Sequence, residues 1–181
     1  CPFFRDLFDS NGPLSGLGLV FHLIHNPLKH RASSIRKLFH DHKKHIGHST
    51  SIRMSYSVDN HPFYLRLLAW HSLILTRNTC TTSIVERALD NLIHHFEQGF
   101  NLIIEGLTEK QIRFLKALVE GNQRLYSEAA RERYHLGSSG NITRLKSSLE
   151  NRLIIQCNRV EIVFTDPIFR QWLQRRYFSK F

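Results

Sequence analysis

The sequence has few cysteines, and no two of them lie close together. Cys1, Cys80 and Cys157 are the three cysteines in 181 residues, and no C-x-x-C pair occurs. Disulfide frameworks and zinc ribbons need several cysteines at short, regular spacings. The cysteine pattern therefore excludes both, and a reducing, cytoplasmic setting is expected.

Long apolar runs are missing as well. Residues 15–24 are apolar, but they are too few to span a membrane and are broken by glycine and histidine. No basic start followed by an apolar run and a small-residue cleavage site is present, so no secretory signal and no membrane partner are predicted. The first residue is Cys and not Met, which suggests a fragment or processed chain whose natural N-terminus lies upstream.

The sequence also lacks the motifs of common catalytic sites. It has no G-x-x-x-x-G-K-[ST] phosphate loop and no apolar run that ends in paired acids for magnesium. The lone G-x-G at residues 16–18 is followed by neither Lys nor a helix signature. No Ser-His-Asp or Cys-His arrangement has a sequence signature. We therefore predict no catalytic residue in this chain.

Histidines are numerous, but their spacing does not favour a metal site. His40, His42, His45 and His48 lie close together, and His94 and His95 are adjacent. Zinc sites favour ligands at i and i+4 on a helix, or pairs completed by cysteine or carboxylate. His40 and His42 would point to different helix faces. We interpret the first group as a solvated basic stretch and predict no metal ligand.

Positive charge is the strongest feature of the composition. Lys and Arg number 25 against 15 acidic residues, a net charge of +10, while 41% of the residues are hydrophobic. Such a chain is globular, and its charge favours an anionic partner such as DNA, RNA or an acidic protein face. A merely solvated basic surface is the alternative.

Residues 107–181 have the pattern of a winged helix-turn-helix. Thr108 and Gln111 form a capping box for a helix that stops at Gly121, and further helices begin at Ser127 and at residues 138–140. Period-two alternation then predicts strands at residues 153–157 and 160–164 around a turn at residues 158–159. Asp166-Pro167 begins a last helix, in which we expect Trp172 to pack against the winged helix and Arg170 to pair with an acid such as Asp166.

Residues 34–106 are predicted to form a helical domain, and residues 1–33 an irregular segment. Ser33 and Ser34 can cap a first helix, and residues 51–58 can form a second. Pro62 begins a helix that is apolar almost all round and is therefore expected to be buried. A long amphipathic helix runs from Ile84 to Phe96 or beyond, and Phe100 to Gly106 is interpreted as a link to the winged helix. The predicted fold class is mainly α, with one short β-hairpin.

The order of these motifs resembles one family. Asn60 to Tyr64 (NHPFY), Leu107 to Gln111 (LTEKQ), Leu136 to Ser139 (LGSS) and Asp166 to Leu173 (DPIFRQWL) follow one another as in the C-terminal half of prokaryotic, archaeal-type AAA ATPases of the signal-transducing P-loop group. The similarity covers roughly residues 34–178, and the resemblance would place Pro2 to Arg5 at the end of the ATPase core.

This resemblance implies a helical lid and a winged helix that follow a P-loop domain. That domain, with ATP and Mg, would belong to the full-length protein and would be this chain's missing partner. In the family the lid closes on the nucleotide. His61 and Pro62 would therefore lie beside it, with Asn60 and Tyr64 shaping the turn. The alternative is a turn that only holds two helices together.

The winged helix suggests a second set of contact residues. On the predicted third helix and the hairpin, the side chains expected to face DNA or a protein partner are Ser139, Asn141, Thr143, Arg144, Lys146, Arg152 and Arg159. The function expected from the resemblance is coupling of nucleotide state to partner or DNA binding, without catalysis by this chain. The alternative is a stand-alone winged-helix transcriptional regulator that binds DNA.

Overall fold

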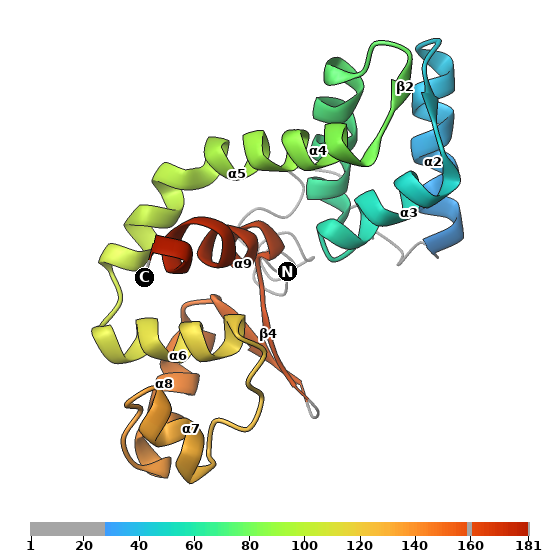
Figure 1. Cartoon of the computed structure of the whole chain (residues 1–181). Helices are drawn as coiled ribbons and strands as arrows, with labels where there is room; N and C mark the ends of the chain where they lie inside the picture. The colour runs from blue at the N-terminus through green and yellow to red at the C-terminus, as the bar shows by residue number, and fades with distance from the viewer. Residues whose placement is uncertain (1–27, 159–160, 181) are drawn as a thin grey trace, which may run out of the picture.

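The computed structural model describes residues 28–158 and 161–180, which form two lobes joined by one long helix (Figure 1). The helical lobe contains α2 (Leu28–Asp41), β1 (His45–Ile46), α3 (His48–Ser57), α4 (Pro62–Leu75), β2 (Thr79–Cys80) and α5 (Thr82–Glu105). The winged-helix lobe contains α6 (Glu109–Val119), α7 (Glu128–Arg133), α8 (Ser139–Asn151), β3 (Ile155–Cys157) and β4 (Ile162–Phe164). The predicted fold class is confirmed.

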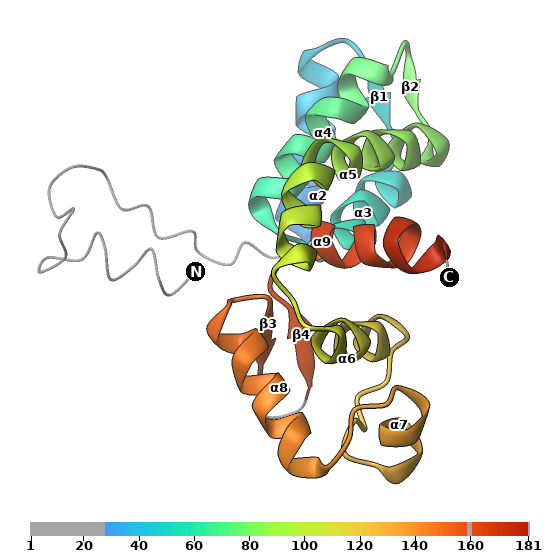
Figure 2. The same cartoon turned by 90° about the vertical axis from the view of Figure 1, so that its left-hand side faces the viewer.

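The last helical segment lies between the two lobes. It consists of α9 (Pro167–Trp172), the π-helical turn η1 (Leu173–Tyr177) and the 3-10 turn η2 (Phe178–Lys180). In Figure 1 it runs beneath α5 and above α6, and Figure 2 shows the same placement from the side. The chain therefore enters the winged-helix lobe through α5 and returns to the junction through α9.

Local signals set the helix boundaries of the winged-helix lobe. The predicted capping box is confirmed, because Thr108 Oγ1 accepts from the Gln111 amide at 3.3 Å and Gln111 Oε1 accepts from the Thr108 amide at 2.8 Å. The Ser127 and Ser138 hydroxyls cap α7 and α8 by accepting from the amides of Ala130 and Asn141, without the reciprocal side-chain bond. Gly121 follows α6 with φ of +80°, a conformation that glycine adopts without strain.

The wing is short and is fastened to the helices beside it. β3 and β4 are antiparallel, with Ile155 opposite Phe164 and Cys157 opposite Ile162. The Asn158 amide donates to the Glu161 carbonyl at 3.1 Å, while Arg159 and Val160 lie outside the described residues. The Gln123 side chain bonds both backbone groups of Ile162, at 3.0 and 3.2 Å. These bonds fix the wing against the loop that precedes α7.

Helix α5 is longer than the sequence pattern predicted. Phe100 to Gly106 was interpreted as a link between the two domains, but the helix continues through this segment to Glu105. The reason is that Phe96, Phe100 and Ile104 extend the apolar stripe of the helix at spacings of four, and the last two are buried. The lobes are therefore joined by a continuous helix.

Two other expectations for the helical lobe are wrong, and one feature was missed. The first described helix begins at Leu28, upstream of Ser33 and Ser34, because buried Ala32 already belongs to its apolar stripe; residues 1–27 of the expected irregular segment lie outside the described residues. Helix α4 begins at Pro62 as predicted, yet Phe63, Trp70 and Ile74 are about half exposed. The sequence pattern also missed the parallel pairing of β1 with β2.

Aromatic packing holds α9 against α5. The buried Trp172 ring stacks on Phe169 with centroids 5.9 Å apart and lies 5.7 Å from the ring of Phe100 on α5. Trp172 Nε1 donates to Glu97 Oε1 at 3.2 Å. The expectation that Trp172 packs against the winged helix is therefore corrected, since its ring and its N–H both meet α5.

Ionic contacts continue this junction along the helical lobe. Arg175 pairs with Glu86 at 3.0 Å and with Asp90 at 3.2 Å, both on α5. Arg170 pairs with Asp59 at 3.0 Å, and not with Asp166 as expected. Asp166 is already engaged, because its Oδ1 accepts from the amides of Ile168 and Phe169 at the start of α9 and its Oδ2 accepts from the Tyr64 hydroxyl at 2.5 Å.

Replacing Tyr64 tests the importance of this contact. Tyr64→Phe removes a hydrogen bond to a carboxylate and should lower the free energy of unfolding by about 1.5–3 kcal/mol. Urea unfolding followed by circular dichroism measures the change. Tyr56→Phe is the matched control, because Tyr56 is 55% exposed and its hydroxyl makes no hydrogen bond with a described residue. Equal effects of the two substitutions would contradict the assignment.

The same contact should make stability depend on alkaline pH. Burial, and then the hydrogen bond to Asp166 and its negative charge, raise the pKa of Tyr64 above its usual value. A raised folded-state pKa contributes stability that is complete below the unfolded pKa of about 10 and is lost as pH rises. The stability gap between wild type and Tyr64→Phe should therefore narrow above pH ~10. A gap that stays constant between neutral and strongly alkaline pH would contradict this.

Candidate functional site

The turn predicted to lie beside a nucleotide is held in place by backbone bonds. Asp59 and Asn60 have positive φ values of 48° and 58°, so the chain reverses between α3 and α4. The amides of Asn60 and His61 donate to the carbonyls of Ser55 and Val58, each at 2.8 Å. Pro62 then occupies the first turn of α4. The turn therefore presents the side chain of His61 in a fixed position.

His61 is partly buried beside Tyr64. Their ring centroids are 4.9 Å apart, and burial lowers the pKa of His61 although Asp166 acts in the opposite direction. The His61 Nδ1 atom is buried and has no hydrogen-bond partner in the described part of the chain. A neutral imidazole with an unused nitrogen can accept or donate one hydrogen bond to a ligand.

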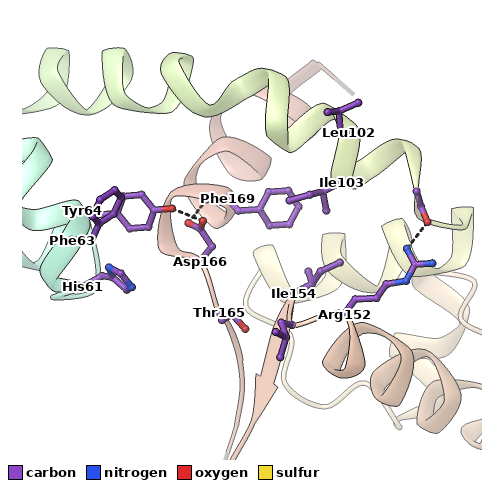
Figure 3. A pocket seen from close by; sticks show the side chains of 12 residues that line it. His61, Phe63, Tyr64, Leu102, Ile103, Arg152, Ile154, Thr165, Asp166 and Phe169 are labelled. Atoms are coloured by element: carbon purple, nitrogen blue, oxygen red, sulfur yellow. Dashed lines mark hydrogen bonds between the residues drawn. The ribbon is translucent and has the colours of Figure 1, made fainter. Parts of the chain in front are cut away.

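His61 and Tyr64 open on a cleft at the junction of the two lobes (Figure 3). Its volume is about 630 Å³. The helical lobe contributes the start of α4 and the end of α5, and the winged-helix lobe contributes the end of α8 and the segment between β4 and α9. The lining residues are His61, Phe63, Tyr64, Leu102, Ile103, Gly106, Arg152, Leu153, Ile154, Thr165, Asp166 and Phe169.

The cleft is mostly apolar, with a few polar groups at its edge. Phe63, Leu102 and Leu153 are 55%, 69% and 50% exposed, so they form an open apolar wall. Arg152 lies across the cleft from His61 and Phe63 (Figure 3), and one of its guanidinium N–H groups donates to the Gly106 carbonyl at 2.5 Å. Because guanidinium has five N–H donors, others remain for an anion. Size, apolar lining and few polar groups are typical of small-molecule sites.

The predicted contact residues of α8 behave differently from one another. Ser139, Thr143 and Arg144 are exposed and Lys146 is half-buried. The Thr143 hydroxyl lies 3.3 Å from that of Tyr126 and donates to the Ser139 carbonyl. Asn141 was expected to reach base edges, but its Nδ2 donates to the Leu136 carbonyl at 2.9 Å and fixes the turn before α8. Arg159 lies outside the described residues.

A shallow polar groove runs along the outer face of α8. Thr143, Arg144, Ser147, Ser148, Asn151 and Arg152 line it, with a volume of about 490 Å³. The sequence pattern predicted that Arg152 contacts DNA or a partner through the winged helix. In the structure Arg152 lines both the groove and the junction cleft. Glu150 on the same helix faces the wing, where its Oε1 accepts from the Cys157 amide at 3.2 Å.

Sequence patterns missed most residues of the junction cleft. Leu102 and Ile103 were assigned to a linker, and Asp166 was expected to begin the last helix and to pair with Arg170. The available signal was that the apolar pair Leu102-Ile103 lies off the buried stripe of α5 and is left exposed. Within the described residues no group of three or more His, Cys, Asp or Glu side chains is placed to hold a metal ion. None of the helices described is both long and apolar enough to cross a bilayer.

Comparison with known proteins identifies part of the chain. Residues 98–175 match the sequence model of a family described as "Probable winged helix domain". No curated protein and no solved structure matches the chain. The matched span begins within α5 and ends within η1, so it includes the cleft wall at Leu102 and Ile103 as well as α9. The match covers less than half of the chain, and it agrees with the winged-helix fold observed for this part.

Proposed function

We propose that this chain is the lid and winged-helix portion of an AAA-type ATP-binding protein, in which it couples nucleotide state to the binding of a partner or DNA. The observation that carries the proposal is the junction cleft, because both lobes build it. A ligand that binds in a cleft shared by two lobes stabilises one of their arrangements over others. The chain itself supplies no catalytic residue in this proposal.

The chemistry of the cleft supports a nucleotide as the ligand. Phe63 on one side of the cleft and Leu102 and Ile103 on the other offer apolar contacts for a flat base, and the unpartnered His61 Nδ1 offers a hydrogen bond. Arg152 lies on the far side with N–H donors suited to phosphate oxygens. The order of NHPFY, LTEKQ, LGSS and DPIFRQWL in the sequence supports the same family. ATP and Mg would be held chiefly by the P-loop domain of the full-length protein.

The junction also supplies a route for coupling. The Tyr64 ring lies beside the His61 ring in the cleft wall. The Tyr64 hydroxyl donates to Asp166, which caps α9. Arg170 and Gln171 of α9 contact Asp59 and the Ser57 carbonyl, at 3.0 and 3.2 Å. A ligand that displaces the turn at residues 59–64 would therefore act directly on α9.

DNA binding by the winged helix alone is the second candidate function. The groove on α8 favours it, because Arg144, Ser147 and Asn151 line an open surface on the helix that enters the major groove in helix-turn-helix proteins. The winged-helix match supports the same module type. In this alternative the chain acts as a transcriptional regulator, and the junction cleft has only a structural role.

Nucleotide binding can be tested on the chain by two-dimensional ¹H–¹⁵N NMR. Addition of ADP should shift the amides at residues 60–64, 102–106 and 152–154, with weak affinity of ~1 mM because the phosphate loop is missing. His61→Ala and Arg152→Ala should each weaken binding several-fold, by about 1 kcal/mol. Arg113→Ala is the charge-matched control, since Arg113 pairs with Glu109 on α6.

Two results would contradict the nucleotide proposal. One is the absence of any shift up to about 5 mM ADP, which corresponds to a negligible interaction at this site. The other is a set of shifts spread over all basic surfaces and reduced equally by Arg113→Ala and Arg152→Ala.

DNA binding by α8 is tested by fluorescence anisotropy with a labelled duplex. Arg144→Ala and Lys146→Ala should each weaken binding and lower the slope of log affinity against log salt by about 1, because each removes a phosphate contact. Arg113→Ala should leave the slope unchanged. Identical slopes for all variants, or no binding at low salt, would rule out this second candidate.

A further inference from the structure

The segment from α2 to the start of α5 is strongly basic, and it lies far from α8. Nine Lys and Arg residues lie between residues 28 and 85, where the acids are Asp41 and Asp59 alone. This segment therefore carries a net charge of +7, against +10 for the whole chain. Asp59 is paired with Arg170. The acids that follow in the helical lobe lie on α5, so the surface of α2 and α4 is suited to a polyanion independently of the winged helix.

The outer face of α4 alternates aromatic and cationic side chains. Phe63, Arg66, Trp70, Ile74 and Arg77 follow at spacings of three and four, and all five are exposed. Phe63, Arg66, Trp70 and Ile74 lie on one face of the helix. Arg77 follows the extended residue Thr76, in the loop after the helix. Neither Arg66 nor Arg77 makes an ion pair with a described residue. Trp70 is 49% exposed, whereas Trp172 is 2% exposed.

The end of α2 extends this face with further cations. The His42 ring meets the Trp70 ring edge-on, with centroids 5.9 Å apart, and Lys44 Nζ donates to the Leu73 carbonyl of α4 at 2.8 Å. Both helices reach the upper end of the molecule in Figure 1, and α8 lies at the opposite end. Beside this contact is a hollow of about 320 Å³, lined chiefly by Arg36, Lys37, His40, Lys44 and His45.

We propose that the outer face of α4 and the adjoining end of α2 bind single-stranded nucleic acid, with a base stacked on Trp70 and phosphates held by Arg66, Arg77 and the α2 cations. An exposed aromatic ring flanked by cations is the arrangement by which proteins hold single strands without reading their sequence. In a duplex the bases stack on one another, so Trp70 would gain no such contact. An acidic polypeptide would use the cations and leave the ring without a stacking partner.

Tryptophan fluorescence tests the stacking step directly. Addition of oligo(dT) to the whole chain should quench Trp70, because base stacking quenches an exposed indole, while buried Trp172 should stay unchanged. In Trp70→Phe the quench should therefore disappear. In anisotropy with a labelled oligo(dT), Trp70→Ala should weaken binding about tenfold, whereas Trp70→Phe, which keeps a ring, should stay within about threefold of wild type.

Charge variants separate this surface from the winged helix. Arg66→Ala and Arg77→Ala should each lower the salt slope for oligo(dT) by about 0.7. The matched control is Arg124→Ala, because Arg124 is an exposed residue of the winged-helix lobe, and this substitution should leave the salt slope unchanged. Arg144→Ala should leave oligo(dT) binding intact. Thermal unfolding of each variant confirms that it is folded, so a loss of binding reports on the surface.

Three outcomes would overturn the proposal. If polyglutamate displaces oligo(dT) when the two carry the same total negative charge, the surface binds an acidic protein. A duplex that binds as well as oligo(dT), with the same loss in Trp70→Ala, would assign it to double-stranded DNA. Binding without quenching of Trp70 would exclude stacking. None of these outcomes decides nucleotide binding in the junction cleft, which is tested with ADP and the His61 and Arg152 variants. Duplex binding by α8 is tested separately, with the Arg144 and Lys146 variants.

Discussion

One carboxylate connects the two lobes. Asp166 uses one oxygen to cap α9 and the other to accept from the Tyr64 hydroxyl at the start of α4. The first role positions Phe169 and Trp172 for packing on Phe100, and the second fixes α9 against the turn after α3. The junction cleft exists because these contacts bring residue 152 of one lobe opposite residue 61 of the other.

The winged-helix lobe was predictable because its boundaries are set by local chemistry. The side chains of Thr108, Ser127 and Ser138 each cap a helix by accepting from the amide three residues later. Gly121 follows the end of α6 with a positive φ. The helical lobe was less predictable for the opposite reason. β1 and β2 pair two residues each across more than thirty positions, which leaves no periodic signal in either segment.

The candidate site was predicted in part. The turn at residues 60–64 was found because Pro62 and the resemblance marked it, but its neighbours Arg152 and Asp166 come from about a hundred residues later in the chain. The partner of Arg170 could not be predicted either, since Asp59 becomes available only through tertiary packing while Asp166 is occupied. The bond from the Asn141 side chain to the Leu136 carbonyl could not be predicted, because it depends on the shape of the turn before α8.

The continuity of α5 has a mechanical consequence. A helix of 24 residues is about 36 Å long at 1.5 Å per residue. Because no hinge interrupts it between the helical lobe and the winged helix, it acts as a lever arm. A tilt of about 10° at its first turn would carry its far end roughly 6 Å, on the same rise per residue. Small movements at one end of this chain are thereby converted into large displacements at the other.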